Sequence, residues 1–324
     1  MSPSFSDSLA STKDHFQSVA RRFVQDVVVS LPPFPSNSVL ERFVVNKALE
    51  VAYAQGLDVE KVTKIAKQSV GVALLVFSRH DPELQQLIAL YTTYFYLVDD
   101  FGGGFVEHLR NFGRNLLLAK PQEPLVLKEW INVLKELDTF YGRHSADTIL
   151  SGTLEFITEA VFEVESAGHL QIHRSAKKFP NYLRIKTGVA APYSSFLFPE
   201  TKFLEDIYLK QYVQAVPDLL EFTSFVNDIL SFYKESIASD ERDNYCYIYA
   251  AAYDLSIEHA LEQLVNKTVE CVRNVRSILS SAPELLEYAE SYIQGCIALH
   301  FYLPRYRLSE LHLLDEKGTF ASGT

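Results

Sequence analysis

Apolar residues recur along most of the chain at the spacing of α-helices, and no run of alternating apolar and polar residues indicates a β-strand. Glycines and prolines interrupt this pattern where helices should end. The pattern therefore predicts an all-α protein. We expect helices at residues 8–30, 38–55, 58–78, 82–99, 104–119, 124–142, 145–167, 179–197, 202–235, 245–280 and 283–302, with the ninth broken near Pro217.

Two segments are apolar almost all round, which is typical of helices that are buried on most sides. They are residues 84–98 and 218–233, and polar side chains within them should face a partner or a cavity. No linker, repeat or low-complexity tract divides the sequence. We expect one α-helical domain across residues 1–324, with flexible ends at 1–10 and 315–324.

The composition and charge of the chain limit the kinds of partner and location that the protein can have. Of the 324 residues, 48% are hydrophobic, and 22 Phe and 18 Tyr could fill a core or line an apolar cavity. A formal net charge of −11 argues against nucleic acid or an anionic membrane as partner. The N-terminal region has no apolar signal core, no apolar stretch is long enough to span a bilayer, and three widely spaced cysteines indicate reduced thiols. A cytoplasmic protein is expected.

The first chemical feature is a stripe of three oxygen-bearing side chains. Asn227, Ser231 and Glu235 are spaced four residues apart, so on a helix they share one face. Amide, hydroxyl and carboxylate oxygens are ligands that magnesium prefers. The alternative is a solvated polar stripe or a serine bonded to its own helix, although the flanking Phe225 and Ile229 disfavour solvent.

A second feature is Asp99-Asp100, which ends the apolar segment 84–98 just before three glycines. Adjacent carboxylates at a helix C-terminus repel each other and oppose the helix dipole, and a divalent cation would reverse this penalty. An exposed, solvated helix end is the alternative. The basic and phenolic groups Arg184, Lys234, Arg305 and Tyr306 suit phosphate oxygens, although each alone could be a surface residue or ion pair.

Together these features resemble the class I terpene synthases. The segment FVNDILSFYKE matches the second metal motif of that family, and YLVDD, PNYLRIKTG and LPRYRL look most like the fungal trichodiene synthase group. The resemblance implies a single-domain class I terpenoid synthase helical bundle around a deep apolar active-site pocket. It also implies a sesquiterpene synthase that uses three Mg²⁺ ions, or Mn²⁺ as a substitute, to ionise farnesyl diphosphate, release diphosphate and cyclise the carbocation. A homodimer is expected on the same ground.

Carried over by motif, the resemblance gives each residue a role. Asp99 would bind two metal ions, and Asn227, Ser231 and Glu235 would bind the third. Arg184, Lys234, Arg305 and Tyr306 would bind diphosphate, while Asp100 would pair with Arg305 when the site closes. Asp228 would support the ligands without binding metal. Closure would order residues 101–105 and 236–244.

One departure from the family motif concerns the acid that usually follows Asp99-Asp100. Here no acid occurs until Glu107, which would substitute only if the intervening glycines form a bulge.

An aromatic cavity would exclude water and stabilise a carbocation with ring faces. Ordinary core packing is the alternative for each candidate. The candidates are Tyr91, Tyr94, Phe95, Phe156, Tyr193, Phe196, Phe225 and the cluster His300-Phe301-Tyr302.

Other motifs and activities carry less weight. Asp81-Pro82 is interpreted as a helix N-cap and not as half of a His80-Asp81 metal pair, and Gly168 separates His169 and His173 from a helical context. A chain-elongating prenyltransferase would normally carry two DDxxD motifs, which this sequence lacks. A non-catalytic isoprenoid-binding helical protein is the remaining rival.

Overall fold

The computed structural model describes residues 5–27, 31–239 and 241–314. Within these ranges the chain is helical and contains no β-strand, as the apolar spacing predicts. The helices are Phe5–Val27 (α1), Ser38–Gln55 (α2), Val59–Leu75 (α3), Pro82–Phe101 (α4), Val106–Leu117 (α5), Leu125–Leu137 (α6), Arg143–Ser166 (α7), Phe179–Thr187 (α8), Ala190–Phe196 (α9), Glu205–Tyr212 (α10), Val216–Phe232 (α11), Tyr245–Tyr253 (α12), Ile257–Leu279 (α13) and Pro283–Tyr302 (α14). Four short helical turns join them: Gly102–Phe105 (η1), Tyr233–Ile237 (η2), Pro304–Tyr306 (η3) and Leu308–Leu311 (η4).

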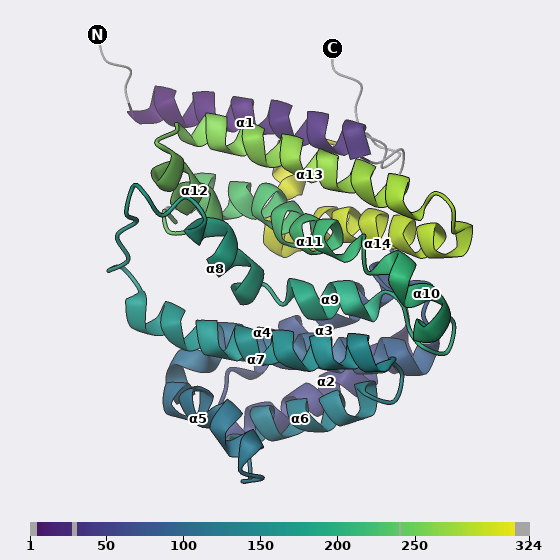
Figure 1. Cartoon of the computed structure of the whole chain (residues 1–324). Helices are drawn as coiled ribbons and strands as arrows, with labels where there is room; N and C mark the ends of the chain where they lie inside the picture. Colours follow the sequence, from purple (N-terminus) through teal and green to yellow (C-terminus); the bar gives the residue numbers. More distant parts are fainter. Residues whose placement is uncertain (1–4, 28–30, 240, 315–324) are drawn as a thin grey trace.

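The helices form a layered bundle (Figure 1). α1 lies along α13 at one edge, and α5 and α6 lie at the opposite edge. Between these edges, α3 packs on α4, and α11 packs on α9, α13 and α14. The central helices are the ones that surround the cavity described below.

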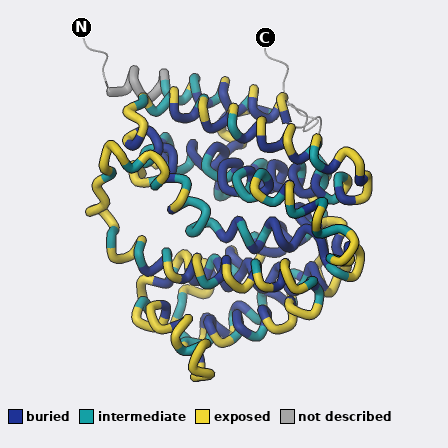
Figure 2. The backbone as a smooth tube through the Cα atoms, in the orientation of Figure 1, coloured by how far each residue is buried: buried dark blue, intermediate teal, exposed yellow. Residues whose placement is uncertain are grey.

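Burial follows the same arrangement, with dark, buried segments in the middle of the bundle and exposed positions on its outer helices (Figure 2). α4 and α11 are buried along most of their length, which agrees with their nearly continuous apolar sequences. The largest side chains that are fully enclosed include Trp130, Tyr91 and Tyr94. Removing this much apolar surface from water is the main stabilising contribution to such a bundle.

Three of the expected helices are interrupted. The segment 179–197 divides at Gly188, because the next residue, Val189, adopts a left-handed backbone with φ of 44°. The segment 202–235 divides ahead of Pro217, as expected, since proline fits the first turn of α11. The segment 245–280 divides at Asp254, which is also left-handed, and Ser256 then caps α13 by accepting from His259 N–H.

The chain ends and the cysteines agree only in part with the sequence predictions. Residues 1–4, 28–30 and 315–324 lie outside the described residues, whereas Phe5 already begins α1. All three cysteines are free and buried. Among the described helices, none has the length and apolar character needed to cross a membrane.

Candidate active site

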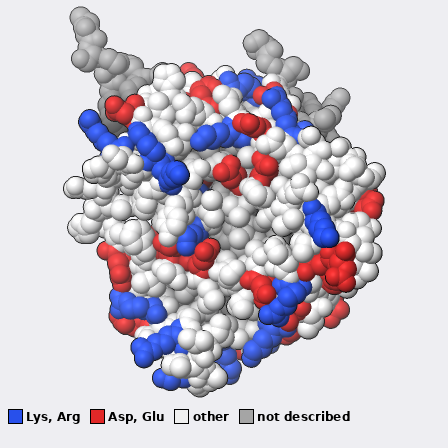
Figure 3. Space-filling model, viewed as in Figure 1, with Lys and Arg blue, Asp and Glu red and all other residues white. Residues whose placement is uncertain are grey.

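A cavity of about 700 Å³ opens near the middle of the molecule. Acidic and basic side chains gather around a recess on the face shown in Figure 3. Its walls come from α3, α4, α7, α8, α9, α11, α12 and α14, together with η2, η3 and the residues that precede α12. The lining includes apolar side chains such as Val72 and Leu299, and charged side chains surround the recess at the surface (Figure 3). The cavity therefore combines an apolar wall with a charged entrance.

The oxygen-bearing stripe lies at the C-terminal end of α11. Asn227 lines the cavity, one turn before Ser231, and Ser231 is only 1% exposed. Among the described residues the Ser231 hydroxyl has no hydrogen-bond partner, which is costly for a buried polar group. The helix then widens into the π-helical turn η2, which carries Glu235; such turns are frequent at functional sites. Glu235 contacts Lys234 Nζ at 3.2 Å.

Arg184 of α8 is held by the same helix. Its Nε lies 2.8 and 2.9 Å from the two carboxylate oxygens of Asp228, and its Nη2 donates to Ser224 O at 3.2 Å and to Asn227 Oδ1 at 3.4 Å. Both charged side chains are largely buried, at 15% and 10% exposure. Burial raises the pKa of Asp228 to about 6, against the opposing effect of Arg184. Asp228 therefore anchors Arg184 beside Asn227.

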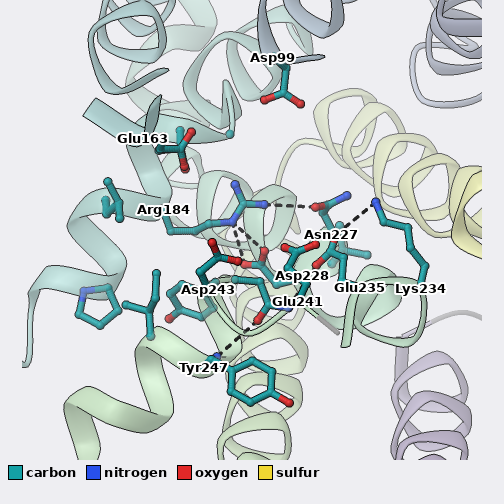
Figure 4. Close-up of a pocket in the computed structure, with 18 of the residues that line it drawn as sticks. Asp99, Glu163, Arg184, Asn227, Asp228, Lys234, Glu235, Glu241, Asp243 and Tyr247 are labelled. Carbon is teal, nitrogen blue, oxygen red and sulfur yellow. Dashed lines mark hydrogen bonds and ion pairs between the residues drawn. The ribbon is translucent and has the colours of Figure 1, made fainter. Parts of the chain in front are cut away.

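The opposite side of the recess carries Asp99 of α4 and Glu163 of α7 (Figure 4). Desolvation and then the neighbouring Asp100 raise the pKa of Asp99 to about 6. Desolvation and then Asp99 raise the pKa of Glu163 to about 7. Glu163 is a carboxylate that the sequence motifs did not single out, because it lies far from Asp99 in sequence and follows no family motif.

Asp100 does not pair with Arg305 in this structure. Its carboxylate lies 3.3 Å from Lys61 Nζ. Arg305 Nη1 donates to Gln68 at 3.3 Å, and its guanidinium lies 5.2 and 5.5 Å from the ring centres of Tyr96 and Tyr306. Glu107 forms an ion pair with Arg110 on α5 and is absent from the cavity lining.

Tyr306 and His300 close the cavity on the side of α14. Their ring centres are 4.2 Å apart, and both side chains contact Asn227. His300 is 4% exposed, and burial lowers its pKa to about 4. The imidazole is therefore neutral at pH 7.

Of the aromatic residues expected around the cavity, Phe95, Tyr193 and His300 line it. The others lie outside the lining. Phe156 packs behind Phe95 at 4.8 Å between ring centres, and Phe225 stacks on Tyr245 at 5.3 Å. The remaining residues outside the lining are Tyr91, Tyr94, Phe196, Phe301 and Tyr302. Lining residues that the sequence did not single out include Val72, Val76, Tyr96, Thr223, Cys296 and Leu299.

The sequence offered two candidate metal sites, the stripe of Asn227, Ser231 and Glu235 and the pair His80-Asp81. Within the described residues, no group of three or more His, Cys, Asp or Glu side chains is placed to hold a metal ion. A divalent cation at α11 would thus depend on the amide of Asn227 and the hydroxyl of Ser231, with Glu235 as the carboxylate. Such oxygen donors fit magnesium, and a Ser231 hydroxyl without a partner among the described residues is free to coordinate a cation. His80 Nε2 instead lies 2.6 Å from Phe196 O, and Asp81 occupies the N-cap position of α4 without a side-chain cap bond.

The fold is that of the class I terpene synthases. Linalool/nerolidol synthase from Streptomyces clavuligerus superposes with a TM-score of 0.62, covering 85% of this chain and 99% of that chain at 12% sequence identity. A cucumene synthase variant superposes with a TM-score of 0.57, covering 86% of this chain and 99% of that chain at 14% identity. This likeness confirms the expected all-α terpenoid synthase fold.

Sequence comparisons give the family. An (E)-beta farnesene synthase from Metarhizium brunneum (strain ARSEF 3297) is 32% identical over 256 residues, which are 79% of this chain and 77% of that protein. Trichodiene synthase from Fusarium sporotrichioides is 23% identical over 263 residues, covering 79% of this chain and 68% of that protein. The family model described as Trichodiene synthase (TRI5) matches residues 45–319. The chain belongs to the trichodiene synthase family and is a class I terpene cyclase.

Proposed function

We propose that this protein is a magnesium-dependent sesquiterpene synthase that ionises farnesyl diphosphate, releases diphosphate and converts the carbocation into a hydrocarbon product. The observation that carries the proposal is the buried Ser231 hydroxyl, which has no partner among the described residues and lies along α11 between the cavity-lining residues Asn227 and Glu235. A buried hydroxyl between two other oxygen donors fits a ligand that would supply its missing partner.

The residues around the mouth divide into ligands for cations and ligands for diphosphate. Asn227, Ser231 and Glu235 would hold magnesium on one side, and Asp99 would hold it on the other. Bound magnesium would neutralise the negative charge that develops on the departing diphosphate. Arg184, Lys234, Arg305 and Tyr306 would bind diphosphate oxygens through charge-assisted and phenolic hydrogen bonds.

The interior of the cavity would control the carbocation. Phe95, Tyr96 and Tyr193 present aromatic rings to it, and aliphatic residues such as Val72 and Leu299 complete the wall. A cation facing such rings is stabilised by about 0.5–2 kcal/mol per good contact. The same surface excludes water, which would otherwise trap the cation as an alcohol.

The choice of a fifteen-carbon substrate rests on the relatives. The named products of two of them, (E)-beta farnesene and trichodiene, are fifteen-carbon hydrocarbons. Another relative, from Postia placenta, is named a monoterpene synthase and is 33% identical over 187 residues, which are 57% of this chain and 54% of that protein. Geranyl diphosphate is therefore the comparison substrate.

The test is incubation of the purified protein with farnesyl diphosphate and magnesium, followed by mass spectrometry of volatile products. We expect a sesquiterpene that disappears in excess EDTA and returns with added magnesium. A longer prenyl diphosphate in the presence of isopentenyl diphosphate would identify a chain-elongating enzyme instead. Binding without turnover would identify a non-catalytic isoprenoid carrier.

The homodimer and the cytoplasmic location remain predictions.

A further inference from the structure

The amide of Asn227 can coordinate a cation only with its oxygen, so the orientation of that amide decides whether it is a ligand. The two ends of an amide have nearly the same shape, and only hydrogen-bond partners distinguish them. In this structure Nδ2 of Asn227 lies 3.3 Å from His300 Nε2 and 3.4 Å from the Tyr306 hydroxyl. Its Oδ1 faces the opposite way, toward Arg184 Nη2.

The tautomer of His300 follows from its other nitrogen. Nδ1 lies 2.7 Å from the backbone oxygen of Cys296, one turn earlier in α14. A carbonyl oxygen can only accept, so Nδ1 must carry the proton. In a neutral ring Nε2 then has a lone pair and accepts, and it is this acceptor that meets the Asn227 NH₂ group.

The reversed orientation of the Asn227 amide would place acceptor against acceptor and donor against donor. With the amide reversed, its oxygen would face the lone pair of His300 Nε2, and its NH₂ group would face the guanidinium N–H of Arg184. Arg184 is held in its place by two further contacts from Nε to the Asp228 carboxylate. His300 is equally constrained, since its ring is 4% exposed and packed against Tyr306.

We propose that His300 is a positioning residue that holds the Asn227 amide with its oxygen on the side of Arg184, away from His300, where it can bind magnesium. The Cys296 carbonyl fixes the tautomer of His300, and that tautomer in turn fixes the orientation of the Asn227 amide. The proposal rests on the proposed function, because it assumes that Asn227 binds a metal ion. It adds that this ligand is oriented in advance by a residue that does not contact the metal.

The first test needs no variant. Nitrogen-15 NMR of histidine-labelled protein reports which ring nitrogen is protonated. We expect His300 with its proton on Nδ1. We expect the opposite tautomer for His80, which is also buried but has Nε2 beside a backbone carbonyl. Finding the His300 proton on Nε2, or on both nitrogens, would overturn the proposal whatever the enzyme does.

The second test measures magnesium affinity by calorimetry in the presence of inorganic diphosphate. Removing a residue that orients a metal ligand commonly weakens metal binding about 10- to 100-fold. We expect that loss for His300→Phe, which keeps a ring but removes the acceptor. His300→Gln can place an oxygen near the position of Nε2 and should recover most of the affinity. His80→Gln is the matched control and should bind magnesium as the wild type does.

The Asn227→Asp background separates orientation from packing. A carboxylate presents oxygen in either orientation and needs no positioning, so adding His300→Phe there should change magnesium affinity less than about threefold. Wild-type affinity in His300→Phe, with a cooperative thermal transition, would refute the inference. An equal loss in both backgrounds would also refute it, by showing that His300 acts through cavity shape. Failure of the wild-type protein itself to bind magnesium with diphosphate would instead refute the proposed function.

Discussion

At the scale of single residues, Glu235 is the carboxylate of the proposed magnesium site on η2, and its loss should slow ionisation itself. Removing one group that stabilises developing charge typically costs about 3–4 kcal/mol, or 100- to 1,000-fold in rate. Glu235→Ala should therefore reduce all products together and leave their ratio unchanged. Turnover and product spectra at saturating magnesium measure both quantities. A variant with wild-type turnover would show that this helix does not serve the metal.

Phe95 should behave in the opposite way, because its ring lines the cavity instead of the charged mouth. Phe95→Ala removes a ring contact worth about 0.5–2 kcal/mol, so turnover should fall moderately while the product profile becomes mixed. Phe198→Leu is a suitable control, because Phe198 is 1% exposed but lies outside the lining and packs on Phe203 and Tyr212. That control should lose stability and keep its product. An unchanged profile in Phe95→Ala would remove Phe95 from product control.

His80 provides a prediction about stability and pH. Burial lowers its pKa to about 4 from the ordinary value of 6.5, so the unfolded chain binds more protons between these two values. The free energy of unfolding should fall as pH decreases through that window, by up to about 3 kcal/mol for this group. His80→Gln keeps an N–H for Phe196 O but cannot titrate. Its stability, measured by urea unfolding, should approach that of the wild type as pH falls from 6.5 to 4, and the difference should be constant above pH 7.5.

The sequence identified the mouth of the site better than its interior. Asn227, Arg184 and Tyr306 belong to motifs, and the structure brings them together. The aromatic lining could not be predicted in the same way, because α4 is apolar all round and its rotation is set by its neighbours. Phe95 and Tyr96 face the cavity, whereas Tyr94 on the same helix is buried elsewhere in the core.

At the scale of elements, the break between α8 and α9 positions Arg184. A methyl group on Gly188 would collide with the end of the Arg184 side chain and push the guanidinium out of its position against Asp228, whereas no backbone would have to shift. Gly188→Ala should therefore cost little stability but disturb the contact with Asp228. A hydrogen bond to a charged group is worth about 1.5–3 kcal/mol, so we expect kcat/KM to fall about 10- to 100-fold.

Gly113 supplies the matched control for this substitution. It lies exposed within α5, where an added methyl meets only Leu154 at an ordinary 3.9 Å. Gly113→Ala should raise the free energy of unfolding by about 0.5–1 kcal/mol and leave activity unchanged. Equal losses of activity in the two variants would show that the position of Arg184 is not the cause.

Helix existence was predictable from apolar spacing, but two of the breaks were not. Pro217 predicts the helix boundary before it, because proline suits a first helical turn and lacks an amide donor. Val189 and Asp254 carry no such signal. A β-branched residue is unfavourable in the left-handed region, so Val189 adopts it only because the packed helices on both sides require the turn.

At the scale of the whole molecule, we predict closure of the mouth around diphosphate. In the present structure Asp100 contacts Lys61 and Arg305 contacts Gln68, so an Asp100–Arg305 pair would require both to change partners. Hydrogen exchange should slow at least about tenfold in residues 102–105 and 241–244 when magnesium and inorganic diphosphate are added together. Peptides from α13 should not change. Unaltered exchange in both segments would exclude this form of closure.

The ion pairs already present at the mouth have a consequence for what the protein can capture. Arg184 forms an ion pair with Asp228, and Lys234 forms one with Glu235, so neither cation is free to attract an anion by itself. The chain as a whole carries a formal charge of −11, which repels a bare polyanion at long range. An incoming phosphate that lacks divalent cations would have to separate these pairs and leave carboxylates uncompensated. Glu235 would bind magnesium and Lys234 a phosphate oxygen, so a diphosphate that arrives with magnesium would satisfy both members of that pair. We therefore expect the mouth to favour it over metal-free phosphate compounds.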